Sequence, residues 1–231
     1  DGYNDPRGGG HFSARVTTPV VAAGTIAKKT LAKIIADRYL VDILPEVKAS
    51  LLEIGGEKDS SKWPEMIDAI MKEGDSLGGI VECTVNNIPA GTGEPFFASI
   101  ESVISHVIFS IPGVRGVEFG DGFAASRMKG SEHNDPFIAE PVGEGEYFIH
   151  PSKNGAGGIN GGIANGNPIV FRVAFKPTST IHKAQTTYNF AKEDMDVLQA
   201  PGRHDACFAL RTPVIVESMA AIALADLVSL Q

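Results

Sequence analysis

The chain has 231 residues, which is enough for one large domain or two small ones whose core needs no disulfide or metal ion. Its formal net charge of -8 argues against a broad nucleic-acid-binding surface, because such a surface needs a basic face. Any site for an anionic ligand must therefore come from a local cluster of arginines.

Helix signals occur in four segments, at about residues 20–36, 64–73, 95–110 and 213–229. Thr18-Pro19 is a typical helix start, and Gly74 is a typical stop. The third segment carries an apolar stripe at helical spacing. The last segment is apolar on most faces, so we expect it to be buried deeply. No apolar run reaches the ~20 residues that span a bilayer.

Strand signals, which are runs of β-branched and aromatic residues, occur at residues 79–88, 114–119 and 169–175. Gly120-Asp121-Gly122 predicts a hairpin turn. The polar stretch 126–154 predicts a long loop with a short strand near Tyr147. Because helices and strands do not alternate regularly, we predict a single α+β domain over residues 1–231, with antiparallel sheets and helices packed on them.

Two glycine-rich segments are candidates for ligand binding. Residues 7–15, RGGGHFSAR, place exposed backbone N–H groups between arginines that could bind a phosphate or carboxylate; a flexible loop with solvated arginines is the alternative. Residues 154–166, NGAGGINGGIANG, match neither the phosphate-binding loop nor the dinucleotide-binding pattern. Alone, such a run is more often a mobile loop than a cofactor cradle.

Two further segments carry polar chemistry. Residues 176–180, KPTST, offer a lysine and three hydroxyls that suit a flavin phosphate or ring edge, although a plain turn fits equally well. Residues 202–205, GRHD, combine an arginine, an imidazole and a carboxylate as an acid–base group, with an exposed charged loop as the alternative. The six histidines lack ligand spacing, so we expect no metal site. The two cysteines, Cys83 and Cys207, are typical of a reducing cytoplasm.

These motifs, taken together and in this order, resemble those of the chorismate synthase family along essentially the whole chain. The matching stretches are RGGGHFSAR, AAGTIAKK, NIPAGTGEPFF, GVEFGDGF, GSEHND, GGINGGIANGNPIVFRVAFKPTSTI, GRHDAC and VESMAAIALAD. The resemblance implies a lyase of the shikimate pathway, which serves aromatic amino acid biosynthesis. The family converts 5-enolpyruvylshikimate 3-phosphate to chorismate and phosphate by a 1,4-elimination.

Family membership would also imply a fold, a cofactor and an assembly. The fold is a β-α-β sandwich, with helices between antiparallel sheets, and the enzyme is a cytoplasmic homotetramer. Reduced FMN is required although the reaction has no net redox change, and NADP is associated with the family. The flavin donates electron density as phosphate leaves, and its N5 takes the hydrogen lost from the adjacent ring carbon.

Site residues follow from the resemblance, motif by motif. Asp205 matches the acid–base carboxylate near flavin N5, while Arg15 and Arg203 are candidate contacts for the anionic substrate. The implied flavin contacts are His11, Phe12, Ser13, Pro112, Gly113, Gly161, Lys176, Pro177, Thr178, Ser179, Thr180 and Arg203. We expect these segments to converge on one pocket.

Some stretches depart from the family pattern. His11, Phe12 and Val16 replace the Arg, Ser and Glu of the common GGRSSARE form, and residues 34–62 match poorly. Family members carry a longer N-terminal part with two essential histidines, so the resemblance implies that this chain is the C-terminal two-thirds and is inactive alone. A non-catalytic flavin-binding or oligomerising paralogue is one alternative, and an unrelated sugar- or phosphate-binding protein is another.

Overall fold

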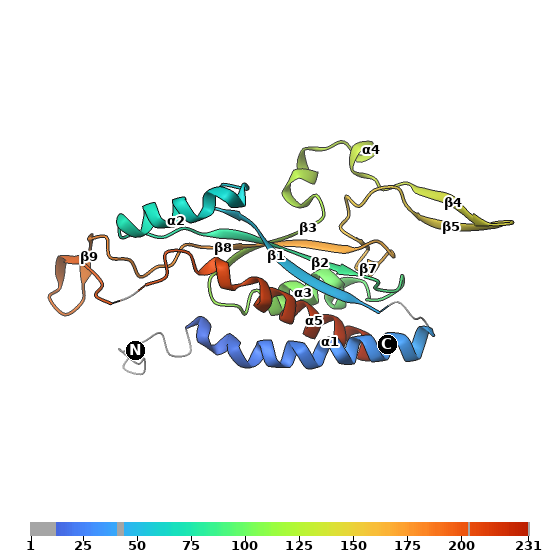
Figure 1. Ribbon diagram of the computed structural model, residues 1–231, viewed down its shortest axis with the longest axis horizontal. Coiled ribbons are helices and arrows are strands. Elements are labelled where there is room, and N and C mark those ends of the chain that lie inside the picture. The colour runs from blue at the N-terminus through green and yellow to red at the C-terminus, as the bar shows by residue number, and fades with distance from the viewer. Residues whose placement is uncertain (1–12, 41–43, 203, 231) are drawn as a thin grey trace.

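The computed structural model describes residues 13–40, 44–202 and 204–230 (Figure 1). The helices are α1 (Thr18–Tyr39), α2 (Trp63–Lys72), α3 (Ile100–Ile108), α4 (Gly130–His133) and α5 (Pro213–Leu230). The strands are β1 (Glu46–Ile54), β2 (Gly79–Asn86), β3 (Val114–Phe119), β4 (Phe137–Gly143), β5 (Glu146–Pro151), β6 (Ile159–Asn160), β7 (Ile163–Ala164), β8 (Ile169–Phe175), β9 (Gln185–Asn189) and β10 (Asp194–Leu198).

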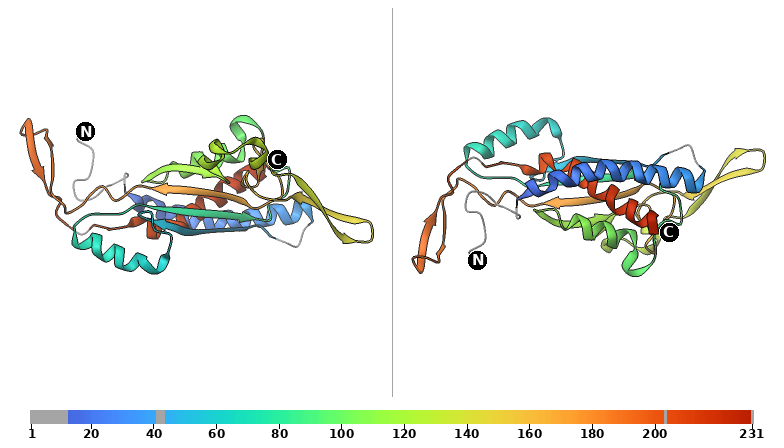
Figure 2. Two further views of the ribbon diagram at one scale, coloured as in Figure 1. Left: turned by 90° about the horizontal axis from the view of Figure 1, so that it is seen from above. Right: turned by 90° about the horizontal axis from the view of Figure 1, so that it is seen from below.

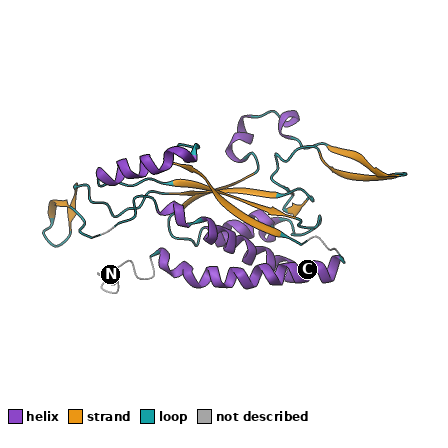
Figure 3. Cartoon of the chain, viewed as in Figure 1, coloured by secondary structure: helices purple, strands orange, loops and turns teal. Residues whose placement is uncertain are grey.

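A four-stranded sheet of order β1-β2-β8-β3, antiparallel throughout, forms the centre of the molecule. Helices α1, α3 and α5 lie on one side of it, whereas α2 and α4 lie on the other (Figures 1 and 3). The predicted α+β class with an antiparallel sheet is therefore confirmed. The β4–β5 and β9–β10 hairpins extend from opposite ends of the molecule in every view (Figures 1 and 2).

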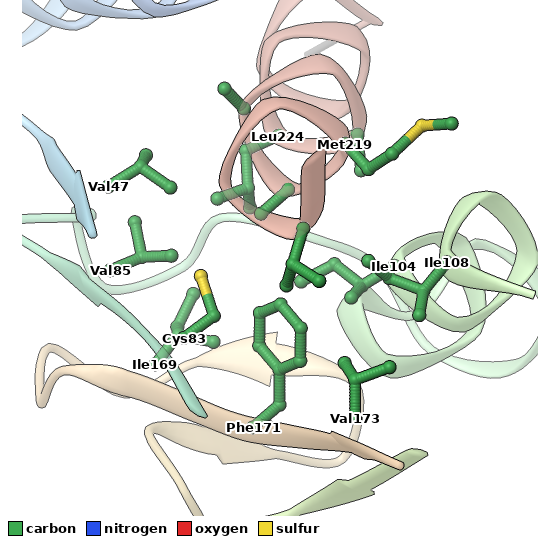
Figure 4. Close-up of a cluster of buried hydrophobic side chains, with 14 of the residues drawn as sticks. Val47, Cys83, Val85, Ile104, Ile108, Ile169, Phe171, Val173, Met219 and Leu224 are labelled. Atoms are coloured by element: carbon green, nitrogen blue, oxygen red, sulfur yellow. The ribbon is translucent and has the colours of Figure 1, made fainter. Parts of the chain in front are cut away.

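The core lies between the sheet and the helices (Figure 4). Alternate residues of a strand face the same side of a sheet, and β8 accordingly buries Ile169, Phe171, Val173 and Phe175. The same buried cluster includes side chains of all four sheet strands and of α1, α3 and α5. A shared core of this kind supports our proposal that the described residues form a single domain.

Helix α5 is apolar on nearly all faces because it packs against α1, α3, β1 and β2 at once. Among the described helices, it alone is long and apolar enough to cross a membrane, and 61% of that stretch is buried inside the protein. Its composition is therefore that of a core helix. The prediction that this helix is deeply buried is confirmed. Its 18 residues bring it closer to the length of a membrane-spanning helix than we expected from the sequence.

One predicted helix begins later than its apolar pattern indicates. The pattern starts at Pro95, but α3 starts at Ile100, where the Ser99 hydroxyl accepts a hydrogen bond from the Ser102 N–H. Phe96 has a φ of 61° and its side chain is 85% exposed, and that of Phe97 is 96% exposed. The 3-10 turn at Phe96–Ala98 ends at Ser99, which caps the start of α3. The two phenylalanines therefore lie outside the apolar stripe of the helix.

The strand predictions located β2, β3 and β8 of the central sheet, but they missed the fourth sheet strand, β1, and most of the exposed hairpin strands. Strands β3 and β8 have the predicted bounds, but β1, β9 and β10 were not predicted. In the stretch 126–154, the short strand predicted near Tyr147 is confirmed as β5, but the rest was not a loop, because it contains α4 and the partner strand β4. Gly120-Asp121-Gly122 is not a hairpin turn, because β3 pairs with β8 and the chain continues into a 3-10 helix at Gly122–Arg127.

Candidate functional site

A cleft of about 380 Å³ lies at the end of the sheet where β3 begins and β8 ends, close to the start of α1. Its lining residues are Ser13, Ala14, Pro112, Gly113, Lys176, Pro177, Thr178, Ser179, Thr180 and Phe208. Eight of these ten are residues that the sequence predicted to contact a flavin. The volume is within the range of roughly 300–1,000 Å³ that small-molecule sites have.

Both the backbone conformation and the packing at position 113, which lines the cleft, require glycine. Its φ of 95° is in the left-handed region, which favours glycine. A Cβ added there would lie 2.4 Å from Cζ of Phe208, so the aromatic ring occupies the space of a side chain. The Gly113 carbonyl oxygen also accepts a hydrogen bond from the Lys176 N–H at 3.0 Å. This bond ties the start of β3 to the loop after β8.

The polar groups of the cleft come mainly from that loop. Lys176 Nζ donates to Ser179 Oγ at 2.5 Å, which brings a cation and a hydroxyl together. Thr178 Oγ1 is enclosed and has no hydrogen-bond partner within the described residues. Ser13 also lines the cleft, and its hydroxyl accepts a hydrogen bond from the Arg15 N–H at 3.3 Å. A lysine beside several hydroxyls can bind a phosphate or another anionic group.

A second cavity of about 180 Å³ adjoins the cleft and shares Thr180 with it. It is lined by Met71, Gly74, Asp75, Thr180, Ile181, His182, His204, Asp205 and Ala206. Asp205 forms an ion pair with Arg211 at 3.0 Å, and 42% of its side chain remains exposed. The Asp205 carboxylate is thus available to a ligand in the cavity.

Two imidazoles and a second carboxylate complete the cavity. The rings of His182 and His204 pack with their centroids 4.9 Å apart, and Nε2 of His204 is enclosed without a hydrogen-bond partner in the described part of the chain. The Ser76 N–H, with help from Lys183, lowers the pKa of Asp75. Asp75 therefore remains ionised near neutral pH, and the cavity combines acidic groups with imidazoles.

Not every predicted site residue reaches the cleft. Gly161 lies in the turn between β6 and β7, at the opposite end of β8, so seven extended residues, or roughly 20 Å, separate it from the cleft. The predicted convergence of all segments is therefore wrong for Gly161 within this single chain. Arg15 is exposed and does not line the cleft. His11, Phe12 and Arg203 lie outside the described residues.

Several residues of the site escaped sequence reasoning. Phe208 lines the cleft, and His182 and Asp75 line the adjoining cavity. The only available signal for Phe208 was an aromatic residue close after the GRHD motif. His182 and Asp75 carry no local pattern, because they are brought together by contacts between distant parts of the chain.

Comparison with known proteins gives consistent matches over almost the whole chain. A family model described as chorismate synthase matches residues 2–229. The chain is 50% identical over 230 residues to the chorismate synthase of Chitinophaga pinensis, covering 100% of this chain and 63% of that protein. It is 44% identical over 249 residues to the chorismate synthase of Korarchaeum cryptofilum, covering 97% of this chain and 65% of that protein.

A solved structure, a crystal structure of chorismate synthase, matches with a TM-score of 0.70 and 27% sequence identity. The match covers 93% of this chain and 63% of that one. The chain thus spans about 63–65% of the length of these relatives.

Proposed function

The chain belongs to the chorismate synthase family, and on this premise we propose that the protein containing it is a chorismate synthase. The proposed reaction is the 1,4-elimination that converts 5-enolpyruvylshikimate 3-phosphate to chorismate and phosphate in the shikimate pathway. The observation that carries this proposal is the cleft, because eight residues predicted from separate motifs as flavin contacts line one cavity. Asp205, the predicted acid–base residue, lies in the adjoining cavity.

The described residues fit reduced FMN as the cofactor. Lys176 and the hydroxyls of Thr178 and Ser179 would bind its phosphate or ring edge, and the enclosed Thr178 Oγ1 has no other partner among the described residues. The Phe208 ring and Pro177 offer apolar surface to a planar ring system. When bound, reduced FMN would supply the electron donation that assists the departure of phosphate.

Asp205 would hold or move the proton in this site. Its carboxylate lies in the cavity next to Thr180, the residue that both cavities share. A carboxylate positioned in this way can act in general acid–base catalysis, which typically contributes ~10²–10⁴-fold to a rate. The imidazoles of His182 and His204 line the same cavity as Asp205 and pack against each other.

An anaerobic assay of the complete gene product tests the proposed function. We expect chorismate and inorganic phosphate to appear together when 5-enolpyruvylshikimate 3-phosphate and reduced FMN are supplied. FMN binding without turnover would instead favour a non-catalytic, flavin-binding paralogue. Absence of both would contradict the assignment of the cleft.

Replacing Lys176 with Met should weaken FMN binding by about ten- to a hundredfold, because a hydrogen bond to a charged group is lost. The dissociation constant can be measured by titration of flavin absorbance. Lys192→Met is the matched control: Lys192 pairs with Asp196 at 2.7 Å on the β9–β10 hairpin and lies outside both cavities. Equal effects of the two variants would show that Lys176 does not bind the flavin.

We also propose that the protein assembles as the homotetramer implied by its family and acts in the cytoplasm. The β4–β5 hairpin supports assembly, because strand pairing places Phe137, Ala139, Pro141, Tyr147 and Ile149 on one face. The exposed fractions are 63% for Phe137, 62% for Tyr147 and 66% for Ile149. An apolar face of this kind on a lone two-stranded hairpin favours contact with another subunit.

The buried free thiols of Cys83 and Cys207 are compatible with a reducing compartment.

Ile149→Lys should therefore shift the protein from a tetramer to smaller species, because it places a charge in an apolar contact. Light scattering coupled to gel filtration measures the mass. Phe148→Lys is the control, since Phe148 is 57% exposed on the opposite face of the same strand, where it stacks with His150. A tetramer that survives Ile149→Lys, or dissociates equally with Phe148→Lys, would contradict a role for this apolar face.

A further inference from the structure

The connector between α2 and β2, residues 73–78, contacts the loop that lines the candidate flavin cleft. Ser76 is only 9% exposed, and its hydroxyl donates a hydrogen bond to the Thr178 carbonyl oxygen at 2.7 Å. These two residues are 102 positions apart in the sequence. Thr178 is the middle residue of the five that this loop contributes to the cleft. The Ser76 hydroxyl therefore orients the peptide group at the centre of the loop.

The same connector also holds the turn that follows the loop. The Gly74 carbonyl oxygen accepts hydrogen bonds from the N–H groups of His182 and Lys183, both at 2.9 Å. Lys183 Nζ donates to Asp75 Oδ2 at 3.1 Å. A Cβ at Gly74 would lie 3.1 Å from Cβ of His182, so the two segments are in close contact. The path of the chain from the cleft to the smaller cavity is thus fixed by residues 74–76.

A third contact reaches the segment that carries Asp205. The Leu77 N–H donates to the carbonyl oxygen of Ala206, the residue after Asp205, at 2.7 Å. From the other side, the His182 ring packs on the ring of His204, the residue before Asp205. Residues 74–77 therefore join the flavin-side loop and the Asp205 segment through one short stretch of backbone.

Of these contacts, the hydrogen bond from Ser76 is the one made by a replaceable side chain at the cleft. The others are backbone hydrogen bonds, the ring contact between His182 and His204 in the smaller cavity, and the partly exposed ion pair between Lys183 and Asp75, which contributes little. Without the Ser76 hydroxyl, the Thr178 carbonyl would lose its partner in a partly buried position. The loop would then have several orientations of that peptide group instead of one.

We propose that Ser76 is a positioning residue, which fixes the Lys176–Thr180 loop for ligand binding without touching the ligand itself. The inference rests on the proposed function, because it takes FMN as the ligand of the cleft. Ser76 does not line either cavity, so its effect passes through the Thr178 carbonyl. The connector as a whole sets the distance between the flavin-side loop and Asp205.

Ser76→Ala in the complete gene product should weaken FMN binding by about five- to thirtyfold, since the partly buried Thr178 carbonyl loses its donor. Hydrogen exchange of the amides in residues 176–183 should become faster in the same variant, with or without FMN. Ser76→Thr, which keeps the hydroxyl, should restore both properties. Flavin titration gives the affinity, and the absorption spectrum of the bound flavin reports its surroundings.

Ser110→Ala is the matched control, because the Ser110 hydroxyl also donates to a backbone carbonyl, that of Val107 at 2.6 Å, but on an exposed turn. Wild-type affinity and exchange in Ser76→Ala would overturn the proposal, as would equal losses in Ser110→Ala. If the wild-type protein binds no FMN, the proposed function fails. The exchange measurement then still decides whether Ser76 orders the loop.

Discussion

Replacing Asp205 with Asn in the complete gene product should lower turnover by about 10²–10⁴-fold and leave FMN affinity nearly unchanged. The amide keeps the size of the side chain but can no longer accept a proton in the reaction. Asp205 lies in the cavity beside the flavin cleft and is not among the residues that line the cleft itself. Steady-state kinetics under anaerobic conditions and a separate flavin titration measure the two quantities.

Asp205→Asn also weakens the ion pair with Arg211, which could by itself lower turnover. The size of the effect distinguishes this structural cause from a catalytic one. The two side chains are 42% and 73% exposed, and exposed ion pairs contribute at most about 1 kcal/mol. Loss of that amount corresponds to roughly a fivefold effect, well below the expected loss of turnover. Arg211→Gln removes the partner and leaves the carboxylate, so it is the control. Comparable losses in both variants, or loss of FMN binding in Asp205→Asn, would mean that Asp205 has a structural role.

Replacing Gly24 with Ala should destabilise the protein by about 2–3 kcal/mol, even though alanine favours a helix. Gly24 is buried where α1 crosses α5. A Cβ there would lie 2.3 Å from Cβ and 2.6 Å from Cα of Ser218. The gain in helix propensity is about 1 kcal/mol, whereas overpacking typically costs about 1–3 kcal/mol and more at rigid contacts. Because the added Cβ would contact the Cα of Ser218, a change of side-chain rotamer cannot relieve the clash and α1 must move away from α5. The cost of overpacking therefore exceeds the gain in helix propensity.

Thermal and urea unfolding of the variants measure this effect, with an expected fall in Tm of about 4–12 °C. Thr25→Ala is the control, since Thr25 is exposed on the next position of α1. In the double variant Gly24→Ala with Ser218→Gly, the clashes with the Ser218 side chain at 2.3 Å and 2.5 Å disappear, and only the close approach to its backbone remains. We therefore expect a favourable coupling of about 0.5–3 kcal/mol between the two changes. If the two changes in unfolding free energy simply add, the close contact between α1 and α5 at Gly24 and Ser218 would be contradicted.

The elements that could be predicted from the sequence are those whose burial imposes a pattern. Strand β8 alternates strictly because one face lies on the core, and α5 is apolar all round because it is enclosed. Strand β9 has mostly exposed side chains, and β4 is exposed throughout, so neither has a buried face to impose a pattern. For these exposed strands, the pairing between neighbouring segments decides the structure, and local sequence contains little sign of it.

The sequence by itself determined the family and the chemical character of the candidate site, because motifs such as KPTST and GRHD are local and keep their order along the chain. Only the tertiary structure decided which motifs share a cavity. The extended backbone of β8 places Gly161 at one end of the sheet and Lys176 at the other, although both lie in matching motifs. The tertiary structure also brings Ser76 into contact with Thr178, although the two residues are 102 positions apart. Such contacts depend on how the sheet orders its strands, and no periodicity in the sequence encodes that order.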